Sequence, residues 1–185
     1  MRTEWIIFLL VAAIVTYAAV VYNRLVRARN LVREGWSGID VQLRRRTDLV
    51  PNLVEVVRGY AAHERGVLEE VTARRANAVA ADDVHGQAAA ALALKAALGR
   101  VMALAESYPQ LKADQNFRKL QDQLAEIEDQ LQMARRYYNG TVRDLNIAIE
   151  TFPNSLIARP LGFREEPFFE LDDRADAAAP KVALS

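Results

Sequence analysis

Cysteine is absent from the 185-residue chain, and glycine, proline and histidine are scarce, at eight, six and two residues. The absence of cysteine excludes a disulfide scaffold, a thiolate metal site, a cysteine nucleophile and a lipidated N-terminal cysteine. The low glycine and proline content favours helix throughout. Basic and acidic residues balance at 24 each, so no net positive charge points to nucleic acid as a partner.

Motifs that carry chemistry are also missing. His63 begins an "HE" pair typical of zinc-binding helices, but Val67 stands where the second histidine is needed. The Glu-x-x-His pairs of di-iron bundles fail as well, because Tyr60 and Asp82 stand three residues before His63 and His85. No serine lies in a nucleophile motif, and there is no glycine-rich phosphate loop. We therefore predict no catalytic residues, no metal, no cofactor and no enzyme activity.

An apolar run is the first strong feature that is present. Residues 5–22 hold no charge and, as a helix, measure roughly 27 Å, close to a bilayer core of about 30 Å. Trp5 and Tyr22 stand at the two ends, where interfacial aromatic residues belong. We predict a transmembrane helix that contacts lipid through 5–22, after a short extracytoplasmic N-terminus at 1–4. A cleaved signal peptide, with "TYA" at 16–18 as its cleavage site, is the rival interpretation.

Flanking charge predicts the orientation of this helix. Arg24, Arg27, Arg29 and Arg33 follow the run and are opposed only by Glu34. The positive-inside rule then places the C-terminal bulk in the cytoplasm and the N-terminus outside. The predicted localisation is the cell membrane, with a single pass.

The rest of the chain repeats apolar residues at helical spacing. Asp82 and Asp83 are candidate N-caps, and Pro109 is a stop signal. The predicted class is all-α, with the transmembrane helix followed at 23–160 by an antiparallel up-and-down four-helix bundle. A C-terminal tail at 161–185 is expected to be extended and partly disordered. The predicted helices cover residues 25–49, 51–80, 87–107 and 115–151.

Pro51 decides how the first two of these helices join. A proline inside a helix costs about 3 kcal/mol, whereas at the first position of a helix it costs almost nothing. We therefore predict a corner at Pro51, with the arginines at 44–46 ending one helix and complementing its dipole. The alternative is one straight rod that runs through Pro51.

The arginine triplet at 44–46 has two further interpretations. It binds anionic lipid headgroups, or it pairs within the chain. Arg46 falls on the apolar stripe and is expected to meet a carboxylate across the bundle, because a partly buried arginine needs a counter-charge. The candidate pairs are Asp40 with Arg44, Arg44 with Asp48, and Arg46 with Glu126, Glu128 or Asp129.

The helix at 115–151 carries a sustained heptad stripe, which either closes a bundle within the chain or forms an intermolecular coiled coil. Intrachain closure is favoured because short connections already supply partner helices. The "EEPFFEL" motif at 165–171 either docks on the bundle or presents a short linear contact. The stripe comprises Phe117, Leu120, Leu124, Ile127, Leu131, Ala134, Tyr138, Thr141, Leu145, Ala148 and Phe152.

Two segments give the chain a specific resemblance. Residues 22–64 contain "WSGIDVQL", "DLVPNLV" and "YAAHE", and residues 105–158 contain "ESYPQLKA" and "ARRYYN". With these motifs in this order, the sequence resembles the LemA family across roughly 1–165. The resemblance implies a membrane-anchored protein with a cytoplasmic helical bundle, N-out and C-in, and it brings no agreed reaction, cofactor or catalytic residue. Gly35 departs from the usual helix-favouring residue and is expected to loosen the helix near Trp36.

These features together predict a scaffold or adaptor at the inner face of the bacterial membrane. An anchor, a helical bundle and the lack of chemical motifs motivate this hypothesis, with an unidentified protein of the cell envelope as the expected partner. An accessory factor for membrane stress response or protease quality control is the alternative. A helical-bundle metalloenzyme or hydrolase is the remaining enzyme hypothesis.

Overall fold

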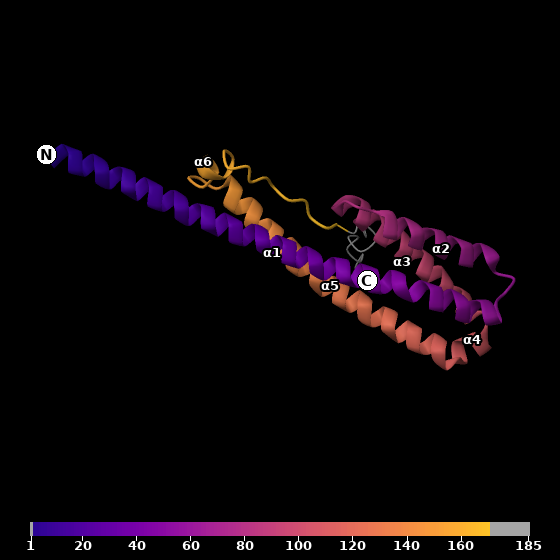
Figure 1. Cartoon of the computed structure of the whole chain (residues 1–185). Helices are drawn as coiled ribbons and strands as arrows, with labels where there is room; N and C mark the ends of the chain where they lie inside the picture. The colour runs from indigo at the N-terminus through magenta and orange to yellow at the C-terminus, as the bar shows by residue number, and fades with distance from the viewer. Residues whose placement is uncertain (1, 171–185) are drawn as a thin grey trace, which may run out of the picture. The chain divides into compact units, whose positions relative to one another are not determined.

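A computed structural model describes residues 2–170 of the chain (Figure 1). All regular elements within that range are helices, which confirms the all-α prediction. Three long helices and three shorter ones follow each other along the chain. They are α1 (Arg2–Tyr60), α2 (Arg65–Ala80), α3 (Val84–Glu106), α4 (Pro109–Ala113), α5 (Gln115–Glu150) and α6 (Ser155–Ala158).

The contacts divide the chain into two compact units. Within the described residues, unit 1 joins 2–42 with Glu128–Phe168, and unit 2 joins Leu43–Ile127 with Phe169 and Glu170. Helices α1 and α5 are each divided, with one part in unit 1 and the other in unit 2.

Helix α1 continues through Pro51, so the predicted corner at that residue is wrong. The separate helices expected at 25–49 and 51–80 are wrong with it. The first reversal of the chain lies at 61–64, and α2 begins only at Arg65. The antiparallel arrangement of four helices stays a prediction.

Burial on both sides of the proline explains why the helix does not break. Val50, Leu53 and Val57 lie on one face of α1 and are almost fully buried, while Pro51 itself is exposed. Each buried side chain of this size contributes about 1.5–3 kcal/mol. A corner would turn this face away from the core and lose more than the roughly 3 kcal/mol that an interior proline costs.

The core of unit 2 is shared by five helices. Helices α2 and α3 pack along each other, as Figure 1 shows, and the C-terminal part of α1 and the N-terminal part of α5 add their apolar faces. The core residues are Val50, Leu53, Val54, Val57, Ala61, Leu68, Val71, Leu94, Ala97, Leu98, Val101, Ala105, Leu111, Phe117, Leu120 and Leu124.

Two aspartates fix where the later helices begin. Asp83 is the N-cap of α3 and accepts a hydrogen bond from the Gly86 amide at 2.8 Å. Asp114 accepts one from the Phe117 amide at 2.9 Å at the start of α5. Such side chains satisfy amides that have no partner within the helix. The predicted starts at 87 and 115 therefore lie within a few residues of the observed ones.

The core of unit 1 forms where α1 meets α5. The Trp36 and Tyr138 rings are 5.4 Å apart. At the same level, a Cβ placed on Gly35 would lie 3.0 Å from the Tyr138 Cα atom. Glycine therefore permits the two backbones to approach, and α1 is continuous there. The expectation that Gly35 loosens the helix stays a prediction.

The buried stripe of α5 drifts from the predicted heptad after Tyr138. Val142 and Ile149 are buried in place of the predicted Thr141 and Ala148, and Phe152 is 75% exposed. A straight helix with 3.6 residues per turn departs from a 3.5-residue repeat by about 20° per heptad. Over several heptads the buried position moves on by one residue.

The tail docks on α5, as one of the two interpretations of the "EEPFFEL" motif predicted. Asn146 exchanges two hydrogen bonds with the Glu166 backbone, donating at 3.0 Å and accepting at 2.9 Å. The Tyr138 hydroxyl donates to the Pro167 carbonyl at 2.8 Å. Burial raises the pKa of Tyr138 to about 12, so the hydroxyl is protonated and able to donate at neutral pH. The disorder predicted at the C-terminus falls outside the described residues.

We predict that Gly35→Ala destabilises the protein, because the new methyl group meets a backbone atom that is held by α5. The expected loss is about 1–3 kcal/mol of unfolding free energy. Gly38→Ala is the matched control, since its Cβ would make an ordinary 3.7 Å contact with the Ala134 Cβ. That variant should be neutral or gain up to about 1 kcal/mol from helix propensity. Chemical unfolding of the purified chain in detergent measures both, and equal effects would contradict the close-approach argument.

Candidate functional site

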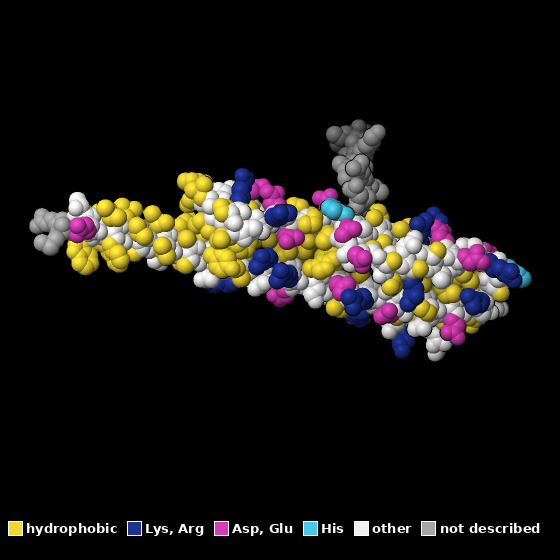
Figure 2. Space-filling model, turned by 45° about the horizontal axis from the view of Figure 1, so that its top comes forward, with side chains coloured by type: hydrophobic (Ala, Val, Ile, Leu, Met, Phe, Trp, Pro, Cys, Tyr) yellow, Lys and Arg dark blue, Asp and Glu magenta, His cyan; other side chains and the backbone are white. Residues whose placement is uncertain are grey.

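The N-terminal part of α1 presents exposed apolar side chains, and Figure 2 shows them along the face in view. The large apolar residues of the 5–22 run are 43% to 67% exposed, with Val21 as the exception. A helix that is apolar all round is typical of a lipid environment or of a buried core. The described residues leave this segment uncovered, with only 6% of its most apolar window buried. It is long and apolar enough to cross a membrane.

Helix α3 passes the same length and hydropathy test but has a different setting. Of its most apolar window, 39% is buried. Its residues Leu94, Leu98 and Val101 belong to the core of unit 2. Its apolar character is thus used within the protein.

Residues 154–163, in the segment that follows α5, pack beside the end of the apolar run. The Tyr17 hydroxyl donates to the Asn154 side-chain oxygen at 3.1 Å. The Tyr22 and Phe163 rings meet edge to face at 5.9 Å. The Arg29 guanidinium lies 5.0 Å from the centre of the Phe163 ring, at cation–π distance. This fixes the chain after α5 at the level of Tyr17 to Arg29.

The arginine triplet lies within α1, not at its end, so the predicted interaction with a helix C-terminus is wrong. Arg46 is 1% exposed, as its place on the apolar stripe indicated, and its Nη1 donates to the Ala91 carbonyl at 3.2 Å. Glu126, one predicted partner of Arg46, instead lies 3.8 Å from the Arg45 guanidinium. The lipid-binding role of 44–46 and the other predicted pairs stay predictions.

The Arg75 side chain replaces the helix hydrogen bond that Pro51 removes. In a regular helix the amide of residue 51 donates to the carbonyl of Thr47, but proline has no amide hydrogen. The Arg75 Nε of α2 donates to this Thr47 carbonyl at 2.8 Å. Thr47 is buried, so an unbonded carbonyl would be costly there. Arg75 thereby ties α2 to α1 at the proline.

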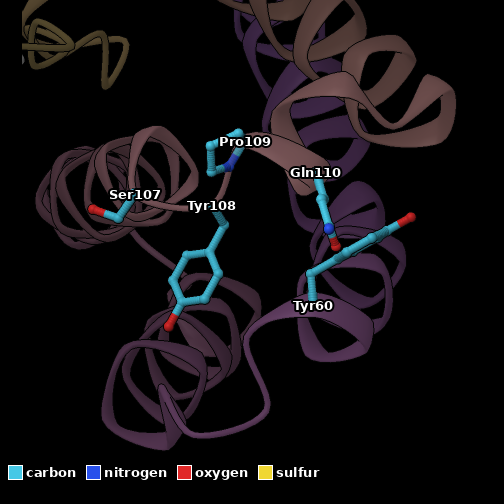
Figure 3. Close-up of a pocket in the computed structure, with 5 residues that line it drawn as sticks. All are labelled: Tyr60, Ser107, Tyr108, Pro109 and Gln110. Atoms are coloured by element: carbon cyan, nitrogen blue, oxygen red, sulfur yellow. The ribbon is translucent and has the colours of Figure 1, made fainter.

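A cavity of about 270 Å³ lies near the reversals of unit 2, lined by Tyr60, Ser107, Tyr108, Pro109 and Gln110 (Figure 3). The Gln110 side chain approaches the Tyr60 ring, whereas the Ser107 hydroxyl points away from both tyrosines. The five lining residues include no carboxylate and no histidine.

Each tyrosine of this cavity donates a hydrogen bond to a carboxylate. The Tyr60 hydroxyl donates to Asp114 at 2.9 Å, and the Tyr108 hydroxyl donates to Glu64 at 3.0 Å. These hydrogen bonds raise the pKa of both tyrosines. The pKa of Asp114 is lowered, first by the Phe117 amide and then by Tyr60. The pairs tie the reversals of the chain together.

The two histidines stand apart from any cluster of ligands. His63 and His85 are exposed. Within residues 2–170, no group of three or more His, Asp or Glu side chains is arranged to hold a metal ion. The absence of a metal and of enzyme activity stays a prediction.

Several of these contacts escaped the sequence-based reasoning. Asn146, Asn154 and Arg75 are polar residues whose partners are backbone or side-chain groups far away in sequence. Only the Arg75 contact had an indication in the sequence, namely Pro51, because a proline inside a helix leaves a carbonyl that needs another hydrogen-bond donor. The donor itself had no sequence signature.

These features define a helical protein with an exposed apolar helix end suited to a membrane and no recognisable catalytic centre within the described residues. A sequence model of the LemA family matches residues 35–184. The chain therefore belongs to the LemA family.

The chain is also similar to curated proteins named for the magnetosome. It is 25% identical to Magnetosome protein MamQ of Magnetospirillum gryphiswaldense, with 85% of this chain and 67% of MamQ covered. It is 26% identical to Magnetosome proteins MamQ 1 and MamQ 2 of Paramagnetospirillum magneticum, with 80% of this chain and 64% of each relative covered. The chain thus spans about two thirds of the length of these relatives.

We predict energetic coupling between Pro51 and Arg75. Arg75→Met should cost about 1–3 kcal/mol of unfolding free energy, because it leaves the buried Thr47 carbonyl without its donor. In a Pro51→Ala background the new amide bonds that carbonyl, so the same change should cost about 1 kcal/mol less. Urea unfolding of the four chains of this double-mutant cycle measures the difference. Equal costs in both backgrounds would show that Arg75 acts independently of the proline.

Proposed function

We propose that the protein is a membrane-anchored scaffold or adaptor whose helical domain lies at the inner face of a bacterial membrane. The exposed apolar end of α1 is the observation that carries the proposal. An uncharged helix of this length is stabilised by lipid and is poorly tolerated in water. The anchor is residues 5–22, and the helices after it close an antiparallel bundle.

Charge beside the anchor supports an N-out, C-in orientation. Arg24, Arg27 and Arg33 are exposed on the first turns after the apolar run. Arginines close to a membrane-spanning helix favour the cytoplasmic side. The helical domain is then cytoplasmic, and the N-terminal side of Trp5 is outside.

The scaffold role rests on what the helical domain offers a partner. It presents long charged helices, and its polar side chains form ion pairs and hydrogen bonds such as Arg100 with Glu70 and Tyr60 with Asp114. These interactions suit a rigid surface for protein contacts. The relatives are named for the magnetosome. From that name we extend to this chain only the idea that it works as part of a larger assembly in the cell envelope.

The orientation predicts opposite labelling of two single-cysteine variants. The native chain has no cysteine, so Thr3→Cys and His63→Cys each introduce a unique and exposed thiol. In intact spheroplasts a membrane-impermeant maleimide should label position 3 and leave position 63 unlabelled until the membrane is opened. The reverse pattern would overturn the orientation. Loss of the Thr3→Cys residue from the mature chain would instead show a cleaved signal peptide.

The scaffold role predicts a specific neighbour. A photo-crosslinking amino acid at Val79, an exposed position on α2, should give a discrete adduct with one envelope protein in living cells. The control carries the same crosslinker together with Leu9→Arg and Ile14→Arg, each of which costs about 2.5–3.5 kcal/mol in a membrane-spanning helix. That control should lose the adduct. If exposed positions on α2, α3 and α5 all give no discrete adduct, the scaffold role is wrong.

A further inference from the structure

Large apolar side chains are exposed on the segment that follows α5. Phe152 is 75% exposed, Leu156 67% and Leu161 54%. Figure 2 shows hydrophobic side chains gathered beside the apolar part of α1, where Figure 1 places α6. Single exposed apolar residues are ordinary. Three large ones within ten residues indicate a surface that is buried against a partner or a membrane.

The position of this segment along α1 indicates what covers it. Its contacts with α1 run from the Tyr17–Asn154 hydrogen bond through the Tyr22–Phe163 ring contact to the Arg29 guanidinium over the Phe163 ring. Tyr17 lies five residues before the end of the apolar run, which is about 7.5 Å along a helix. Elements that lie in a membrane surface bury their apolar faces about 5–10 Å into the boundary between headgroups and acyl chains. The segment is therefore level with that boundary if residues 5–22 span the bilayer.

The backbone amides of the segment are hydrogen-bonded within it, as an apolar environment requires. Every residue from Ser155 to Phe163 that has an amide hydrogen donates it to a carbonyl between Thr151 and Arg159. Pro160 has none to donate. Unbonded amides are costly in lipid, and this segment exposes none of them over that stretch. An irregular loop of the same composition would lack this property.

Charge around the segment complements a lipid surface. Arg159 is exposed between Leu156 and Leu161, and Arg24 and Arg27 are exposed on the adjacent part of α1. Long arginine side chains reach headgroup phosphates while their neighbours contact acyl chains. These three arginines suit the phosphates of a lipid surface.

We propose that residues 152–162 form a second membrane contact, which lies in the headgroup boundary of the leaflet where α1 leaves the bilayer. Phe152, Leu156 and Leu161 enter the apolar side of that boundary, and Arg159 binds headgroup phosphate. The proposal rests on the proposed anchor. A single spanning helix is free to rotate about its axis, whereas a second contact beside it fixes which face of α1 and α5 points to the membrane.

Site-specific fluorescence in vesicles tests the contact. Single cysteines at Leu156 and Val41 of the full chain carry an environment-sensitive NBD probe, and the vesicles contain phosphatidylcholine and phosphatidylglycerol with lipids spin-labelled at shallow or deep positions. Val41 is the matched control, because it is 48% exposed on α1 but lies about 28 Å along the helix from Tyr22. A third probe at Ile14, 60% exposed within the apolar run, reports on the anchor itself.

The expected pattern separates this proposal from the anchor on which it rests. Shallow spin labels should quench the Leu156 probe at least threefold more than the Val41 probe, and deep labels should quench the Ile14 probe. Quenching at Ile14 with equal, weak quenching at Leu156 and Val41 overturns the second contact and leaves the anchor. A blue-shifted Leu156 probe that lipid labels do not quench shows burial against protein, such as a second copy of the chain, and also overturns it. Absence of quenching at Ile14 removes the anchor and this contact together.

Discussion

The carbonyl of Thr47 is the point on which unit 2 depends. Pro51 has no amide hydrogen to donate to it. A buried carbonyl without a hydrogen bond destabilises the helix at that point and favours a break. Arg75 of α2 supplies the donor, at 2.8 Å. With this bond in place, α1 keeps one continuous apolar face through Leu53 and Val57, and the chain reverses only at 61–64. The proline therefore marks where α2 is fastened to α1.

The second constraint is the close approach of two backbones in unit 1. Gly35 allows Tyr138 to pack at the level of Trp36, and the same Tyr138 then reaches the Pro167 carbonyl. Asn146 holds the adjacent Glu166 by two hydrogen bonds. One small residue on α1 thus sets the depth at which α5 packs, and α5 in turn presents the polar groups that hold the tail.

Comparison of particular elements shows where sequence reasoning succeeds. The start of α3 followed from local chemistry, because Asp83 satisfies an amide only three residues away. The cap that Asp114 provides for α5 was not predicted. The apolar run was visible for the same reason, as a property of consecutive residues. The end of the heptad stripe was placed wrongly, because an error of 0.1 residue per turn accumulates along a straight helix. The helix through Pro51 was only the alternative to the predicted corner, because the compensating donor lies 24 residues further on, in Arg75.

The sequence alone determined the helical class, the apolar N-terminal segment, the LemA resemblance and the cap of α3, since each depends on residues that are neighbours in the chain. The tertiary structure decided that α1 passes through Pro51, that Gly35 serves a close approach, and that residues 152–163 pack beside Tyr17 and Tyr22. In each of these cases the free energy comes from groups distant in sequence, and a local propensity of a few kcal/mol is overruled by burial and by hydrogen bonds that only the folded chain brings together.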